Sequence, residues 1–353
     1  MRIIFWQLSN SPHQFALLDA LSRHAEGHTV ELVVTQPLSD ERKRMGWQEP
    51  TYENVLIHRQ PSCAQIDILT RSWIEESVHI FSGLAADTVS TVALNSCIKW
   101  QVRIGIMAEG ADWTGHGLKR YARFVKHALL RFKYGHHILF ILAIGEIGIE
   151  WYLRIGYPKT KIHHFAYYIE NPRISNISPK NIEILYVGRA IRYKGGGLLL
   201  NSLSRLKHLD WRATFVTQGE ERANWEKLSL KLGLDHRVEF KDFEKPELIS
   251  QWMASSSMLI LPNIGDEGWG AVVNEALMQG THVICTILTG AKDMVGGSRG
   301  IIVPPTITAL TAALEYQIIW FSQRRETRQN CQLDMATLVW HVWRQQTLEY
   351  TRY

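Results

Sequence analysis

Short apolar and β-branched runs alternate along the first half of the chain with segments whose apolar residues recur every three or four positions. The runs are Ile3–Trp6, Val30–Thr35, His79–Phe81 and Val102–Ala108. Runs of this kind, separated by helical periods, are typical of a mostly parallel sheet with helices on both faces. We therefore expect the first half to form a doubly wound α/β domain.

The second half repeats this alternation without repeating the sequence. Its strand-like runs are Ile182–Val187, Ala213–Thr217, Arg237–Phe240, Met258–Leu261 and His282–Cys285. Helical patterns lie between them at Leu199–Leu206, Trp225–Leu232, Glu247–Met253 and Val272–Met278. A second doubly wound sheet is expected here.

An aperiodic segment from Tyr167 to Pro179, rich in Asn, Pro and Ser, separates the two patterns. The 353 residues fit two domains, because one domain usually holds roughly 100 to 200 residues. We expect Rossmann-like domains over residues 1–168 and 181–330, with a linker over 169–180. Residues 331–353 are expected to form a helix that returns to the N-terminal domain.

The first helix has a recognisable start. Ser11 can cap it, Pro12 suits its first turn, and Gln14 completes a capping-box pattern before the apolar run that begins at Phe15. Doubly wound sheets bind ligands at the carboxyl ends of their strands. Residues 9–13 are therefore expected at a ligand-binding edge.

Composition narrows the expected environment. The formal charge of +5 is spread over both halves, so it argues only weakly for nucleic acid, which is not an expected partner. Cys63, Cys97, Cys285 and Cys331 are far apart and suggest reduced thiols. The N-terminus lacks the pattern of an export signal, and the apolar run Ile138–Ile144 is too short to span a bilayer. A cytoplasmic protein is expected.

The segment Asp266 to Gly280 carries the strongest chemical signal. Its glycines let the backbone approach an anion where a helix begins, near Gly270, which suits a diphosphate. Glu275, about one turn into that helix, is placed to accept hydrogen bonds from ribose hydroxyls, and Glu267 to lie beside a transferred sugar. The alternative is that Glu267 caps the helix and Glu275 lies on its solvated face.

A second motif runs from Ile184 to Gly196, in which a buried strand leads to Gly188 and Arg189 at the carboxyl edge of the sheet. Lys194 follows on the loop before the next helix. Two fixed cations there would neutralise a leaving diphosphate. The alternative is a solvated basic turn.

These motifs resemble those of the family 4 glycosyltransferases, the large retaining GT-B group, whose hallmarks are G-R-x4-K-G and E-x7-E elements. Gly188, Arg189, Lys194 and Gly195 match the first, while Glu267 and Glu275 match the second. The resemblance covers about residues 182 to 305 and includes Thr217–Glu220 where the family has a glycine-rich turn. It implies two Rossmann-like domains facing across a cleft, with C-terminal helices packing back on the N-terminal domain.

The resemblance also implies a reaction and roles. A hexosyl unit would pass with retention from a UDP- or GDP-sugar to a saccharide or lipid-linked saccharide, without a metal or cofactor, and the chain has no D-x-D pair. Arg189 and Lys194 would hold the donor phosphates, Glu275 the ribose and Glu267 the sugar. The implied donor site comprises Gly188, Arg189, Lys194, Gly219, Phe243, Glu267, Gly268, Trp269, Gly270 and Glu275.

The N-terminal half departs from the family pattern, because Leu8–Gln14 stands where many members have a glycine pair. It resembles a subset that acts in bacterial surface-polysaccharide assembly, with this domain binding the acceptor. His13 would touch the acceptor or a donor phosphate, or be a simple turn residue. Glu109 follows a predicted strand and has either an acceptor-side catalytic role or that of a hydrogen-bonded turn carboxylate.

Residues 117–137 interleave basic with apolar side chains. Such a helix can lie on anionic lipid at the inner face of the cell membrane, or it can be an ordinary surface helix packed on the sheet.

Two rival functions stay open: a sugar-nucleotide epimerase or hydrolase of the same fold, and a non-catalytic subunit that binds a nucleotide sugar or a saccharide. A dinucleotide oxidoreductase is disfavoured, because Gly195–Gly197 does not fit G-x-G-x-x-G.

Overall fold

The computed structural model describes residues 1–24, 27–44, 46–111, 118–169 and 181–323. The chain forms two compact units. The first comprises Met1–Ile169 together with Asp266–Trp269, and the second comprises Glu170–Gly265 and Gly270–Tyr353. The predicted linker beyond Ile169 and the predicted helix over 331–353 lie outside the described residues. Within the described ranges, no helix combines the length and apolar character needed to cross a bilayer.

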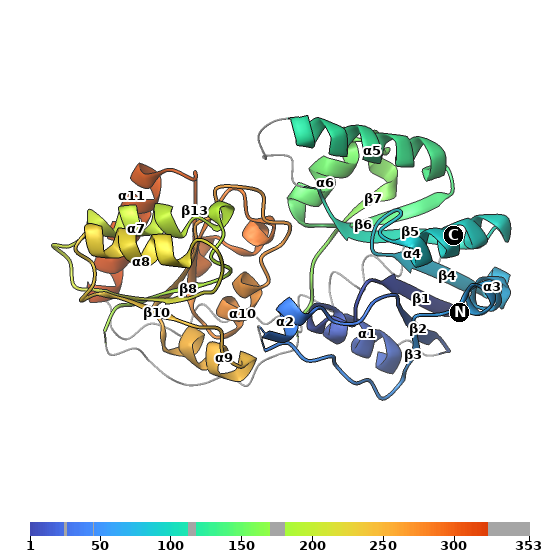
Figure 1. Ribbon diagram of the computed structural model, residues 1–353, viewed down its shortest axis with the longest axis horizontal. Coiled ribbons are helices and arrows are strands. Elements are labelled where there is room, and N and C mark those ends of the chain that lie inside the picture. Colours follow the sequence, from blue (N-terminus) through green and yellow to red (C-terminus); the bar gives the residue numbers. More distant parts are fainter. Residues whose placement is uncertain (25–26, 45, 112–117, 170–180, 324–353) are drawn as a thin grey trace. The chain divides into compact units, whose positions relative to one another are not determined.

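The first unit contains a parallel seven-stranded sheet in the order β3-β2-β1-β4-β5-β6-β7 (Figure 1). Its strands are β1 (Arg2–Gln7), β2 (Thr29–Val34), β3 (Val55–Arg59), β4 (Ser77–Phe81), β5 (Arg103–Glu109), β6 (Ile138–Ile144) and β7 (Ile162–Phe165). Its helices are α1 (Pro12–His24), α2 (Asp40–Arg44), α3 (Cys63–Arg71), α4 (Thr88–Lys99), α5 (Leu118–Tyr134) and α6 (Gly145–Arg154), with 3₁₀ turns η1 (Ile74–Glu76) and η2 (Lys159–Lys161).

The second unit contains a parallel six-stranded sheet in the order β10-β9-β8-β11-β12-β13. Its strands are β8 (Glu183–Val187), β9 (Arg212–Val216), β10 (Val238–Lys241), β11 (Met258–Leu261), β12 (His282–Thr286) and β13 (Gly300–Val303). Its helices are α7 (Gly196–Ser204), α8 (Arg222–Lys231), α9 (Pro246–Ser255), α10 (Val272–Met278) and α11 (Ile307–Gln323), with 3₁₀ turns η3 (Arg192–Lys194), η4 (Gly290–Met294) and η5 (Gly297–Arg299).

In both sheets the direction in which successive strands are added reverses once, at the same place in the strand order. The chain moves outward from β1 to β3 and then returns to place β4 on the other side of β1; β8, β10 and β11 repeat this path. In an open parallel sheet, ligands bind outside the carboxyl ends of the strands at this switch point. The fold therefore selects the loops after β1 and β4 in the first unit, and those after β8 and β11 in the second.

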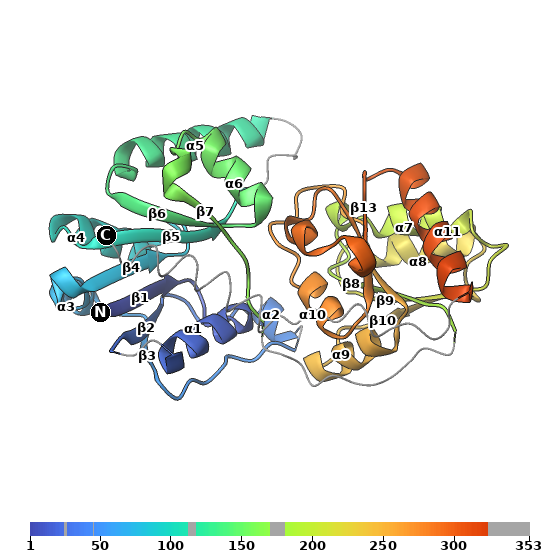
Figure 2. The same cartoon turned by 180° about the vertical axis from the view of Figure 1, so that it is seen from behind.

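Alternating side chains anchor each sheet to its helices. On β1, Ile4 and Trp6 belong to a core shared with α3, α4 and α6, whereas α1 covers the opposite face (Figure 2). In the second unit, Tyr186 of β8 and Ile260 of β11 share a core with α7, α8 and α11. These cores hold the strands in place and leave their carboxyl ends to carry the site.

The structure confirms the two doubly wound α/β sheets, and the predicted strands of both halves are present. Strands β3, β6, β7 and β13 were not among the predicted strands. The capping box at Ser11 was wrong: the Ser11 hydroxyl accepts from the His13 N–H over 3.4 Å, and the Gln14 side-chain oxygen is buried without a hydrogen-bond partner. The complete capping box lies instead at Ser62 and Gln65, at the start of α3.

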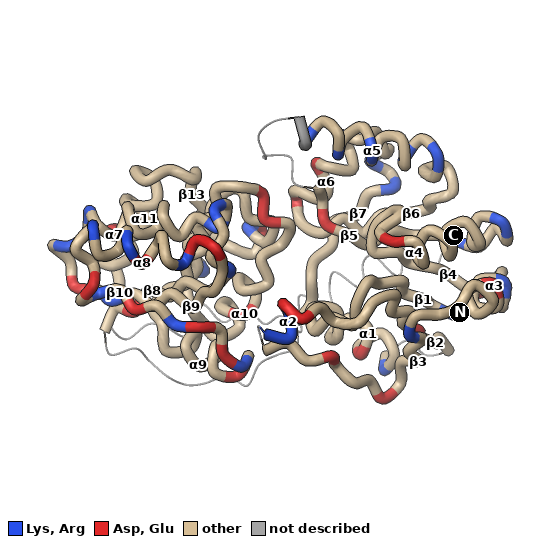
Figure 3. Tube along the Cα trace, viewed as in Figure 1, with Lys and Arg blue, Asp and Glu red and all other residues tan. Residues whose placement is uncertain are grey.

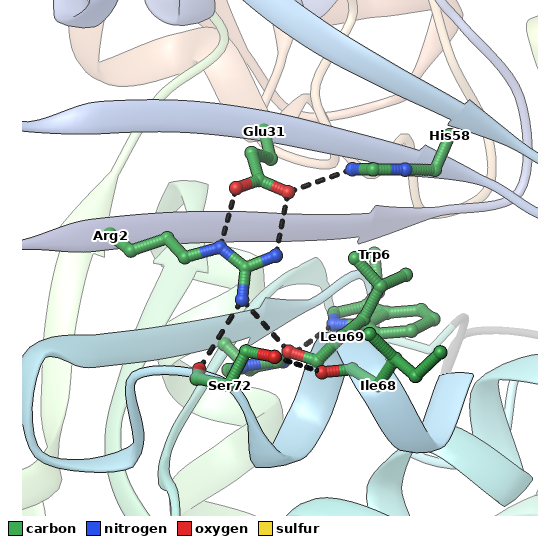
Figure 4. A network of polar contacts seen from close by, with 8 residues as sticks. Arg2, Trp6, Glu31, His58, Ile68, Leu69 and Ser72 are labelled. Atoms are coloured by element: carbon green, nitrogen blue, oxygen red, sulfur yellow. Dashed lines mark hydrogen bonds and ion pairs between the residues drawn. The ribbon is translucent and has the colours of Figure 1, made fainter. Parts of the chain in front are cut away.

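A charged network fastens the amino-terminal edge of the first sheet (Figure 4). The guanidinium of Arg2 on β1 forms an ion pair with Glu31 on β2 and donates to the carbonyl of Leu69 over 2.9 Å. His58 on β3 contacts the same carboxylate over 2.7 Å. Burial alone would raise the pKa of Glu31, but the hydrogen bonds from His58 and Arg2 outweigh it and lower that pKa to about 2.

We predict that Glu31→Ala lowers the free energy of unfolding by about 3 kcal/mol, because it leaves the Arg2 charge largely buried without its partner. The matched control is Glu49→Ala, whose pair with Arg59 is more exposed and contributes less than about 1 kcal/mol. Urea denaturation measures both, and equal losses would contradict the prediction.

The sign of the pH dependence follows from the lowered pKa. Stabilisation by Glu31 is present above pH 4.5, its ordinary pKa, and is lost as the pH falls towards 2.

Candidate functional site

The second unit carries its first motif at the switch point. Gly188 directly follows β8, and its N–H donates to the Val216 carbonyl over 3.2 Å. The buried Thr217 hydroxyl donates to the Gly188 carbonyl over 2.6 Å. Because both groups of Gly188 are bonded to the end of the neighbouring strand β9, Arg189 begins its loop from a fixed position.

The turn after β9, which includes Gly219, packs against that loop. Ala190 donates to the Gln218 carbonyl over 2.7 Å and accepts from the Glu221 N–H over 2.8 Å. The loops after β8 and β9 are therefore one hydrogen-bonded layer at the carboxyl edge.

Arg189 and Lys194 meet around one aromatic ring. The Arg189 guanidinium donates to the Tyr193 hydroxyl over 3.2 Å, and the Lys194 ammonium lies 5.8 Å from the centre of the Tyr193 ring. The sequence analysis missed Tyr193, because it lies within the x4 stretch of the motif, where any residue is allowed. The ring keeps two like charges on the same short loop.

The loop after β11, which leads into the second motif, is held directly against the first. Gly195 is buried with φ 73°, and a β-carbon there would lie 1.8 Å from the Pro262 carbonyl oxygen. The Ile264 N–H donates to the Tyr193 carbonyl over 2.8 Å. The loop after β8 and the loop after β11, about 70 residues apart in the sequence, thus share one edge of the second sheet.

Glu275 lies within α10, whose bounds Val272–Met278 are those of the helix predicted from the sequence. Burial raises the pKa of Glu275 to about 7, so close to neutral pH its carboxyl is about half ionised. A polar ligand that donates hydrogen bonds to it would favour the carboxylate.

Two further predicted donor residues belong to this unit. Gly270 has φ 89° just before α10, and Phe243 is half-buried after the edge strand β10. Its neighbour Asp242 forms an ion pair with Arg222.

Glu267, Gly268 and Trp269 group with the first unit, unlike Glu275. A β-carbon on Gly268 would lie 1.9 Å from a carboxylate oxygen of Glu109, at the end of β5, so a larger residue there would require the Glu109 side chain to move. The buried Trp269 ring meets Tyr167 edge-on at 6.4 Å. A shared cradle of Glu267, Glu275, Arg189 and Lys194 stays a prediction.

Aromatic and polar side chains surround Glu109 and His13. Tyr167 hydrogen-bonds to Glu109; burial and this carboxylate raise the pKa of Tyr167 well above its ordinary value. Tyr167 also lies 5.8 Å from His13, whose other side meets Trp47 edge-on at 4.6 Å. The sequence analysis singled out His13 and Glu109 but missed both aromatic partners, because only the fold brings them together.

His13 is a neutral imidazole in this setting. Burial, followed by the nearby Arg42 charge, lowers its pKa to about 4. Arg42 itself donates to the Ser9 hydroxyl over 3.2 Å and lies over the Trp47 ring at 4.8 Å. At neutral pH the fixed cation at this edge is therefore Arg42, whereas His13 offers only neutral hydrogen bonds and ring contacts.

No group of three or more His, Cys, Asp or Glu residues suited to a metal occurs among the described residues.

We predict that Gly195→Ala lowers the stability of the second unit by at least about 1 kcal/mol, since the new methyl group meets both a left-handed backbone and the Pro262 carbonyl. Gly197→Ala is the matched control. There the β-carbon would make only ordinary contacts with Leu228 and Trp225, and helix propensity favours alanine. Urea denaturation compares the two; an unchanged midpoint for Gly195→Ala would show that the loops are not in contact.

Similarity to known proteins agrees with this geometry. Residues 168–332 match the family described as Glycosyl transferases group 1. Over 125 residues the chain is 28% identical to the alpha-D-kanosaminyltransferase of Streptomyces kanamyceticus, covering 35% of this chain and 32% of that enzyme. The matched part is thus about a third of the relative's length.

Solved structures of low sequence identity share the whole architecture. HepE from Anabaena, in complex with UDP and glucose, matches over 100% of both chains with a TM-score of 0.71 and 15% identity. The lipopolysaccharide outer core galactosyltransferase WaaB matches over 94% of both chains with a TM-score of 0.68 and 16% identity. The chain therefore has the GT-B fold, and its residues 168–332 are similar to the group 1 glycosyl transferases.

Proposed function

We propose that this protein is a retaining group 1 glycosyltransferase that moves a hexosyl unit from a nucleoside diphosphate sugar to a saccharide or lipid-linked saccharide in surface-polysaccharide assembly. One observation carries the proposal: Arg189 and Lys194 lie at the switch point of the unit that matches the family model, on a loop that contacts the loop after β11. Proteins use such an edge to bind nucleotides.

The second unit is the proposed donor-binding domain. Arg189 and Lys194 would hold the diphosphate and stabilise the charge that develops as the sugar departs, so that no metal is required. Glu275 would accept the ribose hydroxyls. The UDP bound in the HepE structure supports a UDP-sugar, with a GDP-sugar as the other candidate.

The first unit is the proposed acceptor-binding domain. Glu109, held by Tyr167, and the neutral His13 would contact the acceptor hydroxyls, while Glu267 would contact the transferred sugar. The leaving phosphate itself would help to remove the acceptor proton. A lipid-linked acceptor would place the enzyme in the cytoplasm at the inner face of the cell membrane.

We predict that the protein transfers sugar from one member of a panel of UDP- and GDP-hexoses to a saccharide acceptor, with activity retained in EDTA. Nuclear magnetic resonance of the product would show the same anomeric configuration as the donor. Release of free sugar or formation of an epimerised nucleotide sugar, without transfer, would contradict the proposal in favour of a hydrolase or epimerase. The absence of turnover with binding retained would favour a binding subunit.

The ribose assignment predicts that Glu275→Ala weakens binding of the nucleotide sugar by about 3 kcal/mol, roughly a hundredfold, because two charge-assisted hydrogen bonds are lost. Isothermal titration calorimetry measures the change. Glu315→Ala is the control, since Glu315 is an exposed carboxylate of α11 in the same unit. Equal affinities for the two variants would remove Glu275 from the site.

The pKa of Glu275 adds a signature to the same experiment. The ribose binds the carboxylate, and a pKa of about 7 means that the carboxyl is mostly protonated at pH 6 and mostly ionised at pH 8. Affinity for a nucleotide sugar should therefore fall about tenfold from pH 8 to pH 6. Glu275→Gln should bind weakly at both values, and a pH-independent affinity of the unaltered protein would contradict this role.

A further inference from the structure

One helix carries more positive charge than the net charge of the whole chain. The chain has 39 Lys and Arg against 34 Asp and Glu. Helix α5, whose sequence is LKRYARFVKHALLRFKY, holds six of the basic residues and no acidic one. The rest of the chain therefore has 33 basic and 34 acidic residues, a net charge of −1. Figure 3 shows this run of Lys and Arg along α5.

The same helix exposes a row of large apolar side chains. Tyr121, Val125, Leu129 and Phe132 are 49%, 52%, 63% and 81% exposed. Their spacings of four, four and three residues place them on one stripe. A surface helix normally turns its apolar stripe towards the core, so this arrangement requires an explanation.

The stripe is not the face that holds the helix to the protein. Phe124 and Leu130 pack against the core of the first unit, and Tyr134 is buried within it. The His127 ring meets Trp151 of α6 edge-on at 5.3 Å. Helix α5 thus packs on the first unit through a different set of apolar side chains, and the exposed row is not needed for that packing.

Cations border the exposed row. Lys126 and Lys133 line, together with Ala122, Val125, Leu129 and Leu130, an open apolar hollow on the helix. Both lysines are exposed. Lysine stems can lie along an apolar surface while their ammonium groups reach a polar layer above it.

We propose that α5 lies along an anionic lipid bilayer, with Val125, Leu129 and Phe132 entering the acyl boundary and Lys126 and Lys133 contacting lipid phosphates. The apolar interior of such a bilayer matches the exposed apolar row, and its negatively charged surface matches the lysines that border the row. The excess of six positive charges with no acidic residue favours this partner over a second copy of the chain, whose own α5 would repel it. The proposal rests on the proposed function in one respect only: a lipid-linked acceptor would be the reason for the enzyme to bind a membrane.

Binding of the full-length protein to vesicles tests the proposal. Phosphatidylcholine vesicles with and without phosphatidylglycerol are sedimented with the unaltered protein, with Leu129→Ser/Phe132→Ser and with Lys126→Gln/Lys133→Gln. The matched control in α8 is Leu230→Ser/Lys227→Gln/Lys231→Gln, which removes a leucine that is 64% exposed and two exposed lysines from a helix of the second unit.

The unaltered protein and the α8 control should bind anionic vesicles equally. The lysine variant should bind roughly 25-fold more weakly, from about fivefold per lysine, and the apolar variant at least about tenfold more weakly. Equal binding of all four proteins, or no preference for phosphatidylglycerol, would overturn the proposal. So would α5 substitutions that change the sedimentation coefficient in solution but not vesicle binding, because the row would then contact a second copy.

Turnover with a soluble acceptor separates this inference from the proposed function. All α5 variants should keep the soluble activity of the unaltered protein, since none of these residues lies in the proposed site. Vesicle binding without transferase activity would leave the membrane surface in place and remove the function. Transferase activity without vesicle binding would leave the proposed function in place and remove the membrane surface.

Discussion

The contact between Gly195 and the Pro262 carbonyl is the constraint on which the candidate site depends. It lies where the second sheet reverses its strand order, and it leaves no room for a side chain. Because of it, the loop with Arg189 and Lys194 and the loop after β11 occupy one edge, although the sequence separates them. Two cations and glycine residues that let the backbone approach a ligand, both at such an edge, suit the binding of a diphosphate.

The sequence allowed the doubly wound fold to be predicted because its central strands are buried on both faces and read as continuous apolar runs. The edge strands β3 and β7 gave no such signal. In β3 only Val55 is buried, and β7 has two histidines between Ile162 and Phe165. The capping pattern at Ser11 was misleading, because short polar motifs can match by chance. The Gln14 side-chain oxygen is buried and makes no capping hydrogen bond.

The site could be predicted as far as the motifs fix the backbone. The motif spacing singled out Gly188, Arg189, Lys194 and Glu275 as candidates, but it gave no indication of Tyr193 or of the rings around His13. Those contacts join elements that are distant in the chain. Helix α5 shows the same limit: its sequence contains two apolar rows, and only the packing of Phe124 and Leu130 shows which row faces the protein.

Hydrogen exchange with and without UDP tests the central claim most directly, because it reports which backbone amides the nucleotide covers. The account predicts that UDP slows exchange in residues 188–196 and 262–275, the loops joined at Gly195, and leaves the edge strand β10 unchanged. Saturating UDP that protects neither loop, or protects only elements of the first unit, would contradict the account.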